Sequence, residues 1–150
     1  TASRGPPGQS CGGWGGAVFH RGGTLVGMNW SVAGGAALAL AVIIGAFGAH
    51  ALEGRLDAYS KGVYETGVMY HFFHALGLLL VSFLPRIGAL TPVRAWWVCA
   101  LLTAGIVLFS GSLYALAISG VRMLGAITPF GGLSFIAAWV LLAFWLMQGR

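Results

Sequence analysis

The sequence predicts an all-α integral membrane protein, a four-helix up-down bundle preceded by a glycine-rich N-terminal extension. Hydrophobic residues make up 58% of the 150 residues, and charged residues only 7%. A water-soluble domain needs roughly a quarter of its residues charged to cover its surface, so most of this surface must face lipid. Four long apolar segments without internal charges, separated by short polar connections, indicate four membrane-spanning helices.

The N-terminal segment, residues 1–27, differs in composition from the rest of the chain. It contains nine glycines, a Pro-Pro pair and few aliphatic side chains. Such a stretch cannot bury enough apolar surface to offset its conformational entropy. We therefore expect residues 1–27 to be held by another protein subunit, and we expect the four-helix domain to occupy residues 28–150, beginning at Met28.

Each apolar segment has the length of a membrane-spanning helix, because roughly 17–25 residues cross a hydrocarbon core of about 30 Å. Strands are excluded, since the segments are continuously apolar and do not alternate. The short connections predict antiparallel neighbours. The expected helices cover about residues 31–50, 67–84, 95–118 and 131–147.

The basic residues lie outside the apolar segments, which is typical of charges that orient a membrane protein and not of a phosphate-binding patch. Nucleic-acid binding is therefore not expected. On the side of the two termini the chain carries Arg4, Arg21, Arg86, Arg94 and Arg150, and on the other side Arg55, Lys61 and Arg122. This excess predicts that both termini are cytoplasmic.

Small residues recur at helical spacing, and in lipid they allow helices to approach closely. The first helix carries Ala37, Ala41, Gly45 and Ala49 at steps of four, and the third carries Gly111, Ala115 and Ser119. We interpret both rows as packing faces inside the bundle. The alternative is that they dock a helix of another subunit.

Polar residues gather toward one membrane face when the chain is arranged as an up-down bundle. These residues are His50, His71, His74, Ser110, Ser112, Tyr114 and Thr128. We interpret them as a structural layer of hydrogen bonds between helices. The alternative is a metal or cofactor site, in which His50, His71 and His74 with Glu53 or Glu65 bind a zinc-like ion or a haem. The HxxH spacing lacks a third fixed ligand, so no cofactor is predicted.

Catalytic signatures are missing: there is no HExxH, Walker loop, GxSxG or dinucleotide fingerprint. The sequence therefore predicts a protein that is not an enzyme. A small channel or transporter is less favoured, because no charge falls at the membrane midplane.

Four ordered motifs resemble a known family. They are GAFGAHAL (45–52), YETGVMYHFFHALGLLL (64–80), LFSGSLYAL (108–116) and TPFGGLSFIAAW (128–139). Together they are similar to the YgdD-like family of small membrane proteins over about residues 31–147. The resemblance implies a four-helix protein of the bacterial inner membrane, in contact with lipids, and no established reaction or cofactor.

These observations predict a non-catalytic accessory or structural subunit of a larger membrane complex, such as a photosynthetic or respiratory assembly. Other membrane subunits and lipids are the expected partners.

Overall fold

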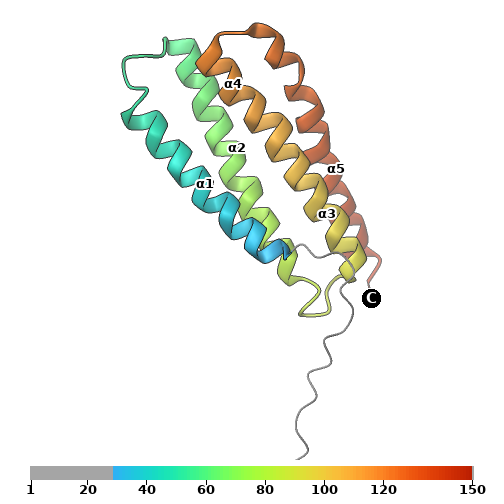
Figure 1. Ribbon diagram of the computed structural model, residues 1–150. Coiled ribbons are helices and arrows are strands. Elements are labelled where there is room, and N and C mark those ends of the chain that lie inside the picture. The colour runs from blue at the N-terminus through green and yellow to red at the C-terminus, as the bar shows by residue number, and fades with distance from the viewer. Residues whose placement is uncertain (1–28, 150) are drawn as a thin grey trace, which may run out of the picture.

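The computed structural model describes residues 29–149, so the expected extension at residues 1–27 lies outside the described residues. In the described part, helices joined by short turns form the predicted four-helix up-down bundle, which confirms the fold class (Figure 1). The helices are α1 (Trp30–His50), α2 (Ala58–Phe83), α3 (Pro92–Gly105), η1 (Ile106–Ser110), α4 (Gly111–Ser119), η2 (Arg122–Ala126) and α5 (Thr128–Met147).

Helix α2 begins at Ala58 and not near Gly67, where the apolar segment starts. The Asp57 side chain caps the helix by accepting a hydrogen bond from the Ser60 backbone amide at 2.7 Å. The 26 residues of α2 extend about 39 Å at 1.5 Å per residue, which exceeds the roughly 30 Å hydrocarbon core. The first turns of α2 therefore project into the headgroup region, where the charged residues Lys61 and Glu65 are tolerated.

The third membrane span is continuous over 28 residues, from Pro92 to Ser119, and comprises α3, η1 and α4. Its start is capped by Thr91, which accepts from the Arg94 amide, and its end is closed by Gly120 at φ 70°. The segment η1 is a π-helical turn, whose extra residue widens the helix in the middle of the span. Gly131 of α5 lies directly against the backbone of this turn at Phe109, where a side chain would not fit.

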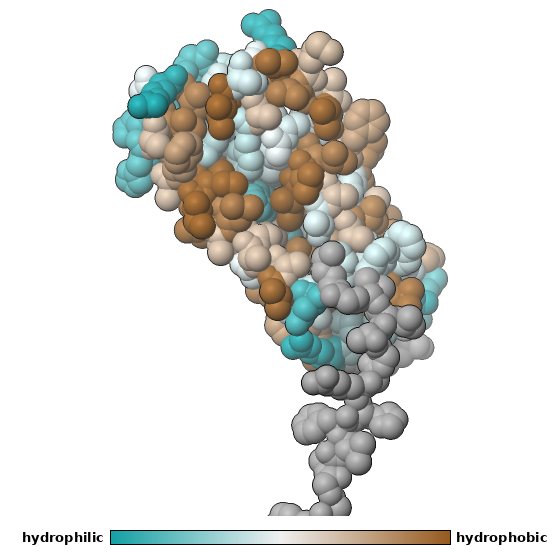
Figure 2. Space-filling view, in the orientation of Figure 1, coloured by the Kyte–Doolittle hydropathy of each residue, from teal (hydrophilic) through white to brown (hydrophobic). Residues whose placement is uncertain are grey.

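Helix α2 is central to the bundle. Helix α1 packs chiefly against α2, whereas α3 pairs with α5 and also contacts α2 (Figure 1). The largest cluster of buried side chains lies between α2, α3 and α5 and includes Ala75, Leu78, Val81, Val98, Cys99, Leu102, Phe135 and Ala138. Apolar side chains also cover much of the outer surface, and polar side chains gather toward the two ends (Figure 2). This is the distribution expected of a protein surrounded by lipid.

The two predicted rows of small residues differ in how they pack. On α1, Ala41 is 1% exposed and Gly45 lies against Val68, so this part of the row does meet α2, whereas Ala49 at the end of the row is exposed. On α4, Gly111 borders open space and Ala115 is exposed. The reason is that α4 turns its other side inward and buries Ser112, Leu113, Leu116 and Ala117.

Candidate functional site

His71 lies in the interior of the bundle, where three helices meet. Its side chain is 3% exposed, and its Nδ1 atom lies 3.3 Å from the hydroxyl oxygen of Tyr114 on α4. The Ala37 carbonyl group of α1 lies close to the same imidazole. His71 therefore provides polar contacts from α2 to both α1 and α4, where lipid offers no alternative partner.

Tyr64 extends this arrangement by two turns toward the membrane surface. Its ring lies 5.2 Å from the Tyr114 ring, and its hydroxyl donates a hydrogen bond to the Ile44 carbonyl of α1 at 2.7 Å. Glycines make room for both rings: Gly48 faces Tyr64, and Gly67 faces Tyr114. We call Tyr64, His71 and Tyr114 the Tyr–His layer; it joins α1, α2 and α4 through side-chain hydrogen bonds and ring contacts.

His74 belongs to a different group of contacts, although it is only three residues from His71. Its Nδ1–H donates to the Tyr70 carbonyl at 2.7 Å, and its ring stacks on Phe135 with centroids 3.4 Å apart. Trp139 lies 6.0 Å away on the same side. The two histidines therefore face different helices, His71 toward α1 and α4 and His74 toward α5.

Two of the predicted polar residues, Ser112 and Thr128, form a third contact, between α4 and α5. Ser112 Oγ lies 2.8 Å from Thr128 Oγ1 and donates to the Phe109 carbonyl at 2.9 Å. Ser110 is fully buried in the π-helical turn, and its hydroxyl has no hydrogen-bond partner within the described residues. The polar layer predicted from the sequence is thus divided into separate contacts between different pairs of helices.

The candidate metal ligands do not converge. His50 is exposed at the end of α1, and Glu65 is exposed with its carboxylate 4.0 Å from Lys61 Nζ. His71 and His74 are each occupied by contacts on separate faces of α2. Over residues 29–149, no three His, Cys, Asp or Glu side chains lie close enough together to hold one metal ion.

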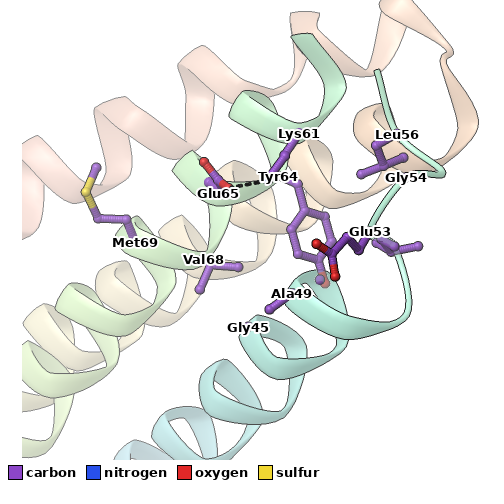
Figure 3. A pocket seen from close by; sticks show the side chains of 12 residues that line it. Gly45, Ala49, Glu53, Gly54, Leu56, Lys61, Tyr64, Glu65, Val68 and Met69 are labelled. Carbon is purple, nitrogen blue, oxygen red and sulfur yellow. Dashed lines mark ion pairs between the residues drawn. The ribbon is translucent and has the colours of Figure 1, made fainter. Parts of the chain in front are cut away.

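A cleft that the sequence did not reveal lies where α1 ends and α2 begins (Figure 3). It has a volume of about 430 Å³ and lies between the last turns of α1, the connecting loop and the first turns of α2. It is lined by Gly45, Gly48, Ala49, Leu52, Glu53, Gly54, Leu56, Lys61, Tyr64, Glu65, Val68 and Met69. The available signal was the coincidence of three charged residues with a glycine-rich helix end. The expected helices at about residues 31–50 and 67–84 left this stretch between them, so the signal was missed.

The cleft has charged side chains at one end and apolar side chains at the other. Glu53, Lys61 and Glu65 supply the charges, and the half-buried Val68 and the exposed Met69 lie further along α2. Two carboxylates and one ammonium give the lining a net charge of −1. Lys61 pairs with Glu65, whereas Glu53 forms no ion pair with any residue the structure describes.

The fold and these sites define a small multi-pass helical membrane protein whose internal polar groups connect its helices. The chain belongs to the family described as "Protein of unknown function (DUF423)", whose model matches residues 44–132. This range contains the Tyr–His layer and the cleft. The resemblance to YgdD-like proteins is thereby confirmed.

Curated relatives are named as membrane proteins. The chain is 51% identical over 107 residues to the UPF0382 membrane protein YwdK of Bacillus subtilis, covering 69% of this chain and 83% of the relative. It is 43% identical over 103 residues to the UPF0382 inner membrane protein YgdD of Escherichia coli, covering 67% and 76%. No solved structure matches the chain. The predicted multi-pass membrane localisation is confirmed, and the bacterial inner membrane agrees with these names.

Proposed function

We propose that this protein is a non-catalytic accessory subunit of a larger membrane complex and that α1 is the helix that docks it. The observation that carries this proposal is a row of exposed residues along α1 at spacings of four, three and four. The row consists of Gly35, Ala39, Val42 and Ala46. We call it the outer seam.

The outer seam has the geometry of a helix-packing surface. Positions separated alternately by four and three residues stay on one face of a helix, and small side chains there allow another backbone to approach closely. The face of α1 that packs on α2 is a different one, formed by Gly34, Ala41 and Gly45. Larger exposed side chains border the outer seam on its other side and form a ridge: Val32, Leu40, Ile43 and Phe47.

The attachment of α1 to its own bundle supports the same role. Helix α1 packs chiefly on α2 and has only Gly34 and Ala41 fully buried. A helix held along one face retains a long apolar surface for lipid or for a neighbouring helix. The Tyr–His layer favours a structural role for the interior, because its side chains are used in contacts between α1, α2 and α4.

The experiment that tests this proposal is site-specific photo-crosslinking in native membranes. A photoreactive side chain is placed at Val42 in the outer seam or at Val140 on α5, which are 59% and 60% exposed and therefore matched in accessibility. The Val42 probe should give one discrete protein adduct at a stoichiometric level, whereas the Val140 probe should give lipid adducts. Lipid adducts alone from both positions would contradict the proposal.

Matched substitutions make this test specific. Ala39→Leu fills the outer seam and should abolish the adduct from Val42. Ala143→Leu makes the same change at an exposed position of α5 and should leave the adduct intact. If both variants retain the adduct, the partner does not occupy the outer seam.

A further inference from the structure

The cleft at the α1–α2 end spans the boundary between headgroups and hydrocarbon. Lys61 and Glu65 lie in the first turns of α2, and their side chains are each 65% exposed. Met69 lies eight residues after Lys61, which places it about 12 Å further along the helix axis. An occupant of this cleft therefore meets charges at one end and apolar side chains at the other, which is the chemistry of an amphiphile.

The shape of the cleft follows from small side chains on α1. Gly45 and Ala49 line the wall of the cleft on α1 (Figure 3). Gly48 lies between them in the sequence and packs against the ring of Tyr64, which is only 4% exposed. The Tyr64 hydroxyl is already bonded to the Ile44 carbonyl, so this residue offers no free donor to an occupant. A volume of about 430 Å³ is within the range of small-molecule sites, roughly 300–1,000 Å³, and suits a headgroup with the first part of a chain.

The charges in the cleft select among headgroups. Glu53 points into the cleft from the loop and is exposed, and it forms no ion pair with a described residue, so its carboxylate is free to receive a cation (Figure 3). Lys61 is only loosely paired with Glu65, at 4.0 Å, and its ammonium has further donors for an anion. A headgroup with an ammonium and a phosphate matches this arrangement, whereas a purely anionic headgroup meets two carboxylates.

We propose that the cleft binds the headgroup of phosphatidylethanolamine, with the primary ammonium on Glu53, the phosphate on Lys61 and an acyl chain along Val68 and Met69. A primary ammonium donates charge-assisted hydrogen bonds to a carboxylate. The quaternary ammonium of phosphatidylcholine has no N–H to donate. The expected order of binding is therefore phosphatidylethanolamine, then phosphatidylcholine, then phosphatidylglycerol.

Native mass spectrometry of the purified, delipidated full chain tests this assignment. The three lipids, with identical acyl chains, are added in equal amounts, and the bound fraction of each is measured. Phosphatidylethanolamine should be retained about three- to fivefold over phosphatidylcholine, the factor expected for one exposed ion pair. Equal retention of all three lipids would overturn the proposal, because it would indicate non-selective surface lipid.

Two charge variants locate the selectivity. Glu53→Gln should reduce the retention of phosphatidylethanolamine to that of phosphatidylcholine. Glu65→Gln makes the same charge change in the same cleft but should preserve the preference, because Glu65 is the residue that pairs with Lys61. An equal loss in the two variants would overturn the assignment to Glu53, as would an unchanged preference in Glu53→Gln.

Two further experiments test whether the lipid binds in the cleft and whether its acyl chain is needed for binding. Ala49→Phe fills the cleft and should lower phosphatidylethanolamine binding, whereas Ala36→Phe, at an exposed position outside the cleft, should not. Equal binding by these two variants would place the lipid elsewhere. Soluble phosphoethanolamine should not displace the lipid at equal concentration, because it lacks the acyl chain; equal displacement would identify a soluble ligand and overturn the lipid assignment.

Discussion

Substitution of Gly34 tests how α1 is attached to the bundle. A Cβ atom at Gly34 would lie 2.8 Å from Leu79 Cα and 2.9 Å from Leu79 N. Non-bonded carbon atoms make optimal contact at about 3.5–4.0 Å, so α1 must move away from α2 by about 1 Å. Both contacted atoms belong to the backbone of α2 and cannot rotate aside. We expect Gly34→Ala to lower the free energy of unfolding by about 1–3 kcal/mol, the usual cost of overpacking.

Gly35 provides the matched control. Gly35 makes no such contact, because a Cβ atom there would have no neighbouring atom within 4 Å. Gly35→Ala should therefore stabilise the protein by up to about 1 kcal/mol, through the higher helix propensity of alanine. The two variants should thus differ by about 1–4 kcal/mol.

The assay is reversible unfolding of the purified chain in mixed micelles with increasing SDS, followed by circular dichroism and tryptophan fluorescence. Both variants change one glycine of the same helix to alanine, so a difference between them reports on the contact with Leu79. Equal stability of Gly34→Ala and Gly35→Ala would refute the reasoning that backbone contact positions α1 on α2.

Three further predictions concern the Tyr–His layer, the start of α2 and the orientation of the chain. Tyr114→Phe removes the hydroxyl that contacts His71 and should lower the free energy of unfolding in the same assay by about 1 kcal/mol, while Tyr59→Phe, at an exposed position, should not change it. Asp57→Ala removes the cap of α2 and should accelerate amide hydrogen exchange of Ser60 at neutral pH. The hydrogen bond from the Ser60 backbone amide holds the pKa of the Asp57 carboxyl below its usual value of 3.8. The cap therefore stabilises the helix above pH 3.8. The difference in exchange between the variant and the parent should disappear as the pH falls through the lowered pKa. A reporter enzyme that works only in the cytoplasm should be active when it is fused to the C-terminus, and one that works only in the periplasm should be inactive. Activity of the periplasmic reporter would reverse the predicted orientation.

The fold was accessible from the sequence because insertion into lipid depends on local composition. Each span needs enough consecutive apolar residues, and that property can be read without knowing what the span packs against. The same logic accounts for the displaced start of α2. Hydropathy marks where the chain enters hydrocarbon near Gly67, whereas the helix itself begins at Ala58, because the Asp57 cap and water-facing turns extend it beyond the membrane core.

The candidate sites were only partly accessible, because the face that a helix presents to its neighbours is a non-local property. His71 and His74 share a spacing of three residues, but neighbouring helices separate them, one toward Tyr114 and the other toward Phe135. The cleft also required the tertiary structure, since Glu53 comes from the loop and Lys61 from α2.

The sequence by itself determined that four uncharged segments must lie in lipid, and it named the polar residues that such an environment forces into contacts. Only the tertiary structure decided which residues meet, because the π-helical turn and the glycines at helix crossings set how closely the helices approach and how they are rotated. Those rotations direct Gly34 toward α2 and leave Gly35 exposed on α1. From the sequence alone, the two adjacent glycines are indistinguishable.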